Sequence, residues 1–162
     1  MDISKTDRAA IEQLFQDMYA AWADNDAARY AACFEPDVDY IAFDGTHVKG
    51  QADNARLHHA LFTGILKGTR LAGQPPQLRA LSDDVVLAHA TGAVVFPWQR
   101  EIAKGRHSIQ TLVLVKRDGR WLAAAFQNTR VKPMPAPEAG SVIVRMFGAY
   151  AAVRRALSQA TS

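Results

Sequence analysis

Residues 116–129 have the sequence KRDGRWLAAAFQNT, which contains the clearest strand and turn signals of the chain. An apolar, β-branched run, Ser108–Val115, precedes it, and Asp118-Gly119 is a strong signal for a tight turn between two strands. The stretch therefore predicts a β-hairpin near the C-terminal end of the chain. Its second strand ends on an amide pair, Gln127-Asn128.

Further strand-like segments precede the hairpin. We expect strands over about 77–81, 85–96 and 107–115, with a fourth over 120–130. Residues 82–84 form a turn, and a longer connection that carries Trp98 spans 97–105. The glycines and prolines between 64 and 76 indicate a surface loop.

The N-terminal part is mainly helical. Apolar residues at three- and four-residue spacing predict a helix over 4–24, and Asp24-Asn25-Asp26 ends it and caps a short second helix over 27–34. Two short strands, 38–43 and 46–49, and a third helix over 52–66 follow.

Helices and strands are thus segregated along the chain, which indicates an α+β fold with a meandering antiparallel sheet. A twisted sheet of this size needs a cover on its concave face, and the N-terminal helices supply it. We therefore expect a domain over 1–133. Residues 134–162 are an extension, with a proline-rich linker (Pro133, Pro135, Pro137) and an amphipathic helix over 141–157 that packs on its own sheet, on a partner subunit or on a membrane.

The composition excludes several classes of protein. With 162 residues and 49% hydrophobic content, the chain has the size of one globular domain and enough apolar residues to bury a hydrophobic core. The net charge of +3 comes mostly from the tail, where Arg145, Arg154 and Arg155 oppose a single carboxylate, Glu138. We therefore expect no nucleic acid partner.

The single cysteine, Cys33, rules out an intrachain disulfide and a cysteine-rich zinc site. No apolar run of membrane-spanning length occurs, and residues 1–5 do not look like a signal peptide. These features predict a cytoplasmic protein that does not bind membranes.

The order of elements resembles the cone-shaped fold of the nuclear transport factor 2-like superfamily, which includes ketosteroid isomerases and SnoaL-like polyketide cyclases. The resemblance rests on DAARYAACFEPDV (26–38), on Gly45 and Gly50, and on Gly119-Arg120-Trp121 leading to Phe126–Thr129. The last motif resembles the ending of the SgcJ/EcaC branch. The resemblance covers about 5–133 and implies a homodimer, formed through the outer face of the sheet with help from the C-terminal helix.

The isomerase residues are missing from the matching positions. The general-base aspartate of the ketosteroid isomerases would fall on Ala42, and their oxyanion tyrosine on Met18, beside Tyr19. Isomerase chemistry by that route is therefore disfavoured. The weak candidates for a replacement base are His89 and Asp44.

The histidines have other interpretations. His58 and His59 are adjacent, so they project about 100° apart on a helix and do not form a metal site. One of the two packs toward the cone mouth. His89 shares a strand face with Val85 and Leu87, and is either a pocket residue or a structural one.

The aromatic residues among the candidates predict a pocket with an aromatic wall. Only one member of the amide pair can face the concave side, because side chains alternate along a strand. In the family a histidine often stands at position 127, so Gln127 removes a titratable group. The predicted ligand-binding residues are Tyr19, Trp22, Tyr40, Phe62, His89, Trp98, Phe126, Gln127 and Asn128.

Three functional hypotheses stay open. The first is a homodimer that binds a small apolar or aromatic molecule. The second is an enzyme of the hydratase, cyclase or isomerase type that acts on a small polycyclic or terpenoid-like substrate. The third is a dimerisation and assembly module with a vestigial pocket. The chain has no phosphate loop, dinucleotide fingerprint or serine-nucleophile motif, and we expect no cofactor and no metal.

Overall fold

The computed structural model describes residues 2–132, 137–138 and 140–160. The contacts within the chain define two units, Met1–Val131 and Lys132–Ser162. Most of the predicted proline-rich linker, including Pro133 and Pro135, lies outside the described residues. The first unit contains the sheet and the helices that cover it.

The N-terminal helices form where the apolar spacing predicts them. Helix α1 (Lys5–Ala23) begins at Ser4, whose Oγ accepts a hydrogen bond from the Asp7 amide at 3.0 Å. Helix α2 (Ala27–Ala31) is shorter than predicted, because the chain is already extended at Phe34. Helix α3 spans Gln51–Thr63.

The described residues form a six-stranded sheet in the order β2-β1-β6-β5-β4-β3. Its pairs are antiparallel except β1 with β6, which are parallel, so the sheet is not the fully antiparallel meander that we predicted. The strands are β1 (Phe34–Ile41), β2 (His47–Lys49), β3 (Arg70–Ser82), β4 (Val85–Val95), β5 (Ser108–Arg117) and β6 (Arg120–Arg130).

The predicted hairpin is confirmed as β5–β6. Asp118 and Gly119 have φ angles of 50° and 78°. Two consecutive positive φ values are typical of a type I′ turn, whose twist matches that of the flanking strands. Glycine and aspartate tolerate this backbone conformation, so the local sequence sets the register of the hairpin.

The loop predicted between 64 and 76 is wrong for its second half. Strand β3 begins at Arg70 and runs through Pro75-Pro76, where the register with β4 shifts between Gln74 and Gln77. Strand β3 lies at the edge of the sheet. Proline is tolerated at an edge and at a bulge, since no ladder hydrogen bond from its nitrogen is needed there.

Strands β3 and β4 approach each other closely at Gly73 and Gly92, which are paired. A Cβ atom at Gly92 would overlap the Ala72 carbonyl oxygen, and one at Gly73 would overlap that of Thr91. Only glycine permits this approach.

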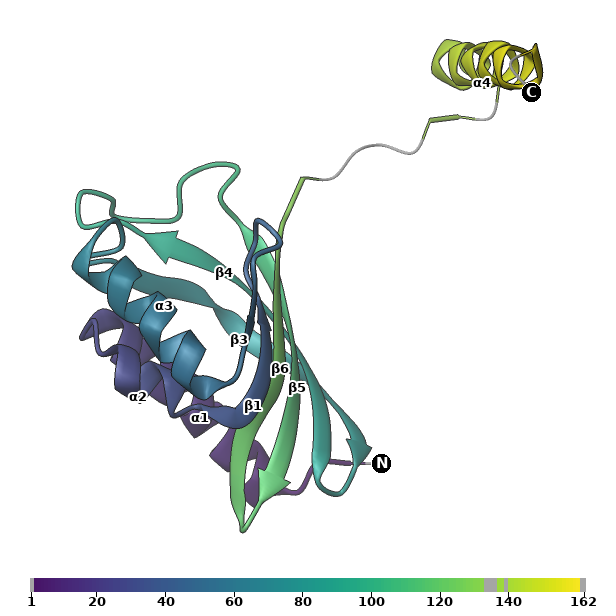
Figure 1. The fold of residues 1–162 in the computed structure, drawn as a ribbon. Coiled ribbons are helices and arrows are strands. Elements are labelled where there is room, and N and C mark those ends of the chain that lie inside the picture. Colours follow the sequence, from purple (N-terminus) through teal and green to yellow (C-terminus); the bar gives the residue numbers. More distant parts are fainter. Residues whose placement is uncertain (1, 133–136, 139, 161–162) are drawn as a thin grey trace. The chain divides into compact units, whose positions relative to one another are not determined.

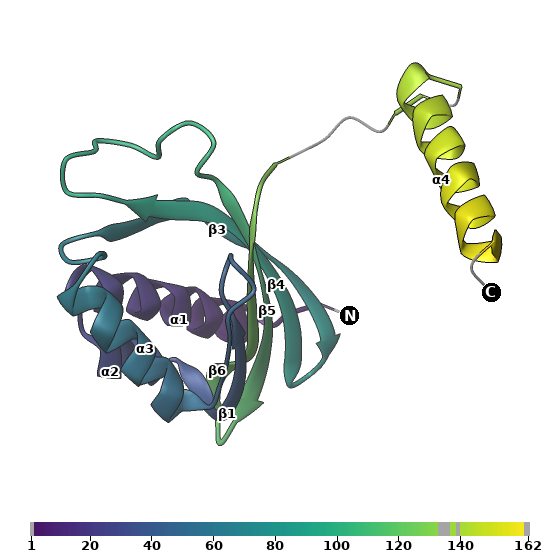
Figure 2. The same cartoon turned by 45° about the horizontal axis from the view of Figure 1, so that its top comes forward.

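The three helices cover one face of the curved sheet, which we call the inner face (Figure 1). Figure 2 shows α1 and α3 within the hollow of the sheet, with β3 curving over them. The buried core lies between these layers and includes Ile11, Phe34, Leu112, Leu114 and Ala123. The result is an α+β cone, as predicted.

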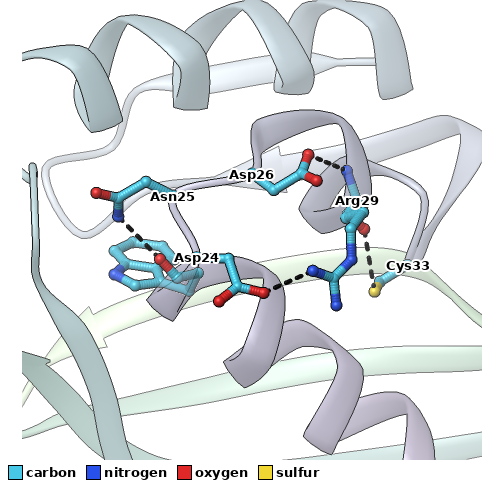
Figure 3. Close-up of polar contacts among 6 residues, drawn as sticks. Asp24, Asn25, Asp26, Arg29 and Cys33 are labelled. Atoms are coloured by element: carbon cyan, nitrogen blue, oxygen red, sulfur yellow. Dashed lines mark hydrogen bonds and ion pairs between the residues drawn. The ribbon is translucent and has the colours of Figure 1, made fainter.

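A polar joint connects α1 to α2 (Figure 3). The Asp26 carboxylate accepts a hydrogen bond from the Arg29 amide at 2.9 Å, and the Arg29 guanidinium pairs with Asp24 at 2.6 Å. Asn25 donates to the Trp22 carbonyl and accepts from the Gly68 amide at 2.8 Å. The joint therefore fixes the end of α1 that carries Trp22.

The second unit contains helix α4 (Val142–Ala160). Its sequence has no carboxylate, and Ile143, Met146, Tyr150, Val153 and Leu157 recur at helical spacing. The predicted amphipathic helix is confirmed. Among the helices in the described ranges, none has the length and apolar character needed to cross a membrane.

Candidate functional site

The inner face of the sheet encloses two adjoining cavities beneath the helices. Alternation along β4 turns Val86, Ala88 and Ala90 inward, and these residues are at most 4% exposed. Of these, Ala90 lines the inner cavity together with Gly92, and their small size leaves space between the sheet and α1. The two cavities share Trp22 and Tyr40 in their walls.

The inner cavity has a volume of about 80 Å³. Its wall is mostly aromatic and aliphatic, with Gln110 and Asn128 as its amide groups. Gln110 donates a hydrogen bond from Nε2 to the Asn128 Oδ1 at 3.2 Å. Other wall residues are Phe15, Met18, Tyr19, Tyr30, Leu112 and Phe126.

The outer cavity is larger, about 160 Å³, and lies between α3 and the ends of the strands. Leu57, Leu61 and His58 of α3 form one wall. Arg106, two residues before β5, and Arg130, the last residue of β6, also line this cavity. An apolar space with a few polar groups is the usual character of a ligand site.

Trp22 is held in place by polar contacts behind its ring. Its Nε1 donates to the Thr69 Oγ1 at 3.0 Å, and the Thr69 side chain is buried. Phe62 packs edge-on against Trp22 with ring centroids 5.0 Å apart. Trp22 is therefore a rigid wall between the cavities and the core.

Two polar side chains, Tyr40 and His58, meet inside the aromatic cluster. The His58 Nδ1 lies 2.9 Å from the Asn54 carbonyl oxygen and therefore donates to it. The Nε2 is then an acceptor, and it lies 3.4 Å from the Tyr40 hydroxyl, which donates. The rings of Tyr30 and His58 are 4.4 Å apart.

Burial keeps these groups uncharged. Desolvation lowers the pKa of His58 to about 4 against a weaker upward effect of the Asn54 carbonyl. Desolvation likewise raises the pKa of Tyr40 to about 12, and it raises the pKa of Tyr30. At neutral pH the cluster therefore offers hydrogen bonds without formal charge.

Asn54, one turn before His58 on α3, is fully buried. Neither its Nδ2 nor its Oδ1 has a hydrogen-bond partner within the described residues. The side chain does not line either cavity. A buried side-chain amide without hydrogen bonds is rare in folded proteins, because burying its polar atoms costs free energy that no hydrogen bond offsets.

Five of the predicted ligand-binding residues line the cavities: Tyr19, Trp22, Tyr40, Phe126 and Asn128. Asn128 is the member of the amide pair on the inner face, and Gln127 is exposed on the other side. Phe62 lies behind Trp22 in the core instead of in a cavity wall.

The other predicted site residues lie away from the cavities. His89 is exposed on the outer face of β4, because the alternation that buries Ala88 and Ala90 turns it outward. Trp98 is 77% exposed and stacks on Phe96. Asp44 lies in the exposed turn after β1, where the Thr46 amide lowers the pKa of its carboxylate. Neither His89 nor Asp44 can therefore serve as the base in these cavities.

Sequence reasoning expected one of His58 and His59 to pack toward the cone mouth without choosing between them, and the structure puts His58 in the lining of the outer cavity. It gave no site role to Tyr30 or to the arginine pair. The signal for His58 is its four-residue spacing from Asn54 and Phe62, which puts all three on the buried side of α3. Arg106 lies in a loop and Arg130 at the end of a strand, where the sequence has no helical or strand periodicity that would predict which way a side chain points. Within the described ranges, no three His, Cys, Asp or Glu side chains gather in a way that would hold a metal.

Fold and cavities together define a cone-shaped α+β protein of the cystatin-like, nuclear transport factor 2-like type. The family model for the SnoaL-like domain matches residues 11–125. The chain therefore belongs to the SnoaL-like domain family. A search of curated proteins found no match.

Solved structures agree with this assignment. A domain of unknown function with a cystatin-like fold from Nostoc punctiforme is 27% identical, with a TM-score of 0.74, and the match covers 98% of this chain and 96% of that one. An uncharacterised protein with a cystatin-like fold from Caulobacter vibrioides is 30% identical over 77% of this chain and 89% of that one, with a TM-score of 0.66. A nuclear transport factor 2-like protein from Novosphingobium aromaticivorans, 20% identical, matches with a TM-score of 0.66 over 87% of this chain and 88% of that one, which shows the fold alone.

Proposed function

We propose that the protein binds a small, largely apolar or aromatic molecule in the two cavities of the cone. The observation that carries the proposal is the pair of adjoining cavities beside Trp22 and Tyr40, which the helices cover and aromatic residues line. A cone whose interior was filled by side chains would instead favour the assembly module with a vestigial pocket.

The cavity volumes limit the size of the ligand. An apolar cavity of about 150 Å³ holds benzene, and the outer cavity has about 160 Å³. A ligand with one ring therefore fits without rearrangement. A steroid-sized or polycyclic molecule requires α3 or the strand ends to move apart.

A cavity-filling variant tests this proposal. Val94 lines both cavities, so Val94→Phe should occupy them, whereas Ala60→Phe places the same ring on the exposed side of α3. We expect p-cresol, indole and methyl benzoate to raise the unfolding temperature of the wild type and of Ala60→Phe, and not that of Val94→Phe. Equal responses of all three proteins would refute the proposal.

The contact between Tyr40 and His58 favours a second candidate, an enzyme of the hydratase, cyclase or isomerase type. The neutral His58 presents an unprotonated Nε2, which is the form that a general base needs. With a pKa near 4 it is a weak base at neutral pH, and its lone pair already accepts the Tyr40 hydroxyl proton. Binding without catalysis is therefore the better supported function.

Deuterium exchange distinguishes the two candidates. An enolising enzyme would exchange the α-protons of a bound cyclic ketone with solvent. The His58→Gln variant would then lose this exchange, whereas the His59→Gln variant would exchange the protons as fast as the wild type. Binding without exchange excludes an enolisation mechanism.

We also propose that the protein is a homodimer that assembles through the outer face of the sheet. Leu87, Val113 and Ala125 form a row across β4, β5 and β6 on that face.

The buried Cys33, whose pKa burial raises to about 11, fits a cytoplasmic setting in which no disulfide is needed. The ending Gly119–Thr129 supports placement in the SgcJ/EcaC branch.

A further inference from the structure

The lining of the outer cavity carries two positive charges and no negative one. It contains Arg106 and Arg130, and no Asp or Glu. His58, which lines the same cavity, is neutral at physiological pH because it is buried. An apolar cavity whose charged lining groups are both cationic attracts an anion with an apolar body.

Both guanidinium groups are fixed by their surroundings. The Arg106 guanidinium carbon lies 5.0 Å from the centre of the Phe96 ring, and that of Arg130 lies 4.9 Å from the centre of the Phe43 ring. Arg130 also donates from Nη1 to the Arg106 carbonyl oxygen at 2.9 Å. A guanidinium that stacks by its face still offers the donors on its edge.

Within the part of the chain that the structure describes, these donors have no anionic partner. Among the described residues, no carboxylate oxygen lies within 4.0 Å of either guanidinium, and the ion pairs of the chain involve other residues. The Nε of Arg106 is buried and lacks any hydrogen-bond partner there. A buried charged donor is normally satisfied, so this one indicates a missing acceptor.

We propose that the ligand of the cone is a small carboxylic acid in its ionised form, with its ring or chain in the cavity and its carboxylate at Arg106 and Arg130. This inference rests on the proposed binding function. The planar, two-donor edge of a guanidinium matches a carboxylate, and the rest of the wall is mainly apolar. The volume of about 160 Å³ suits one ring with a short acidic side chain.

Isothermal titration with phenylacetate and with its methyl ester tests the inference, because the two probes share the ring and differ in charge. The variants are Arg106→Gln and Arg130→Gln, and the matched control is Arg79→Gln, an exposed arginine of β3 that lines no cavity. We expect the wild type and Arg79→Gln to prefer the acid. Each cavity variant should weaken phenylacetate binding about tenfold or more and change ester binding less than about threefold.

Equal affinity for acid and ester, or phenylacetate binding that survives both substitutions, would overturn the inference while the ester still reports on the proposed function. Failure of both probes to bind also overturns it, and the neutral probes above then judge the binding function separately. Thermal unfolding of the unliganded variants checks their fold. Should Arg106→Gln fail to fold, Arg106→Lys, which keeps the charge but lacks the two-donor edge, takes its place beside Arg130→Gln.

Discussion

His58 is the residue on which the interior of the cone depends most. It is 1% exposed, donates to a backbone carbonyl and accepts from Tyr40, and aromatic rings surround it. A histidine in such a place must stay neutral, because its protonated form would lose both the acceptor nitrogen and its hydration. Folding and protonation of His58 are therefore linked.

The first prediction follows from this linkage. The pKa of His58 falls from 6.5 to about 4 on folding, so the unfolded chain binds the proton more tightly. Stability from this group is complete above about pH 6.5 and is lost as the pH falls toward 4, by about 3 kcal/mol in all. Urea unfolding between pH 7 and 4 should show this loss in the wild type.

The control for this effect is the neighbouring histidine. His59 is exposed on the other side of α3, so His59→Gln should keep the pH dependence, whereas His58→Gln should remove most of it. An identical pH dependence in His58→Gln and the wild type would contradict the assignment.

A second prediction concerns Thr69, which accepts the hydrogen bond from Trp22. Thr69→Val has the same shape but leaves the buried indole N–H without its acceptor, so we expect a loss of about 1–3 kcal/mol in unfolding free energy. Thr129→Val, at an exposed position of β6, should change stability by less than about 0.5 kcal/mol. Equal effects in chemical denaturation would show that the bond to Trp22 does not matter.

At the level of elements, the first turn of α1 is tied to the β5–β6 hairpin. Asp7 accepts from the Trp121 Nε1 at 3.0 Å and pairs with Lys116 at 2.7 Å. These contacts, first that with Lys116, lower the pKa of Asp7 to about 2. The Asp7 carboxylate therefore joins α1, the first helix, to the β5–β6 hairpin, which contains the last two strands.

The third prediction tests this link. The folded pKa of Asp7 lies below its ordinary 3.8, so its contribution is present above about pH 4 and is lost as the pH falls toward 2. Asp7→Asn should lower the unfolding temperature at pH 7 by a few degrees and should matter little at pH 2. Asp2→Asn, before the helix, is the control with no expected effect. A difference between Asp7→Asn and wild type that persists unchanged at pH 2 would argue against an ionic origin.

The sequence predicts elements well where local signals are strong. Strand β6 has the predicted bounds, since the Asp118-Gly119 turn and Trp121 fix them locally. Strand β3 was missed over Arg70–Pro76, because Gly73, Pro75 and Pro76 are typical of a loop and only the pairing with β4 holds this segment extended. The parallel pairing of β1 with β6 is likewise a tertiary choice that no local pattern shows.

The candidate site was predictable in part for the same reason. Tyr40 and Asn128 follow from strand alternation once the inner face is known. His89 fails because its neighbours Val85 and Leu87 are apolar but lie on the outer face, which also accepts hydrophobic residues. Arg106 and Arg130 meet only when β5 pairs with β6, so spacing alone could not bring them together.

On the scale of the whole molecule, the C-terminal unit is not peculiar to this chain. The match to the Nostoc punctiforme protein covers 98% of the 162 residues, and therefore reaches into Lys132–Ser162. Other structures match 76–87% of the chain. A helix with a continuous apolar stripe needs another apolar surface to cover that stripe.

The last prediction separates the sheet from the tail in self-association. If the outer face forms the dimer, Val113→Glu puts a charge in the middle of the row with Leu87 and Ala125, and should raise the dissociation constant at least about tenfold. Ala60→Glu, at an exposed position of α3, adds the same charge elsewhere and should leave the dimer intact.

A chain cut after Val131 should remain folded, since the buried core, including Ile11, Phe34 and Leu112, lies before the cut. Sedimentation equilibrium on this shortened chain measures how much the sheet alone contributes to the dimer. A monomeric wild type at micromolar concentration would refute the dimer, whereas a dimer that survives Val113→Glu and dissociates on truncation would assign the interface to α4.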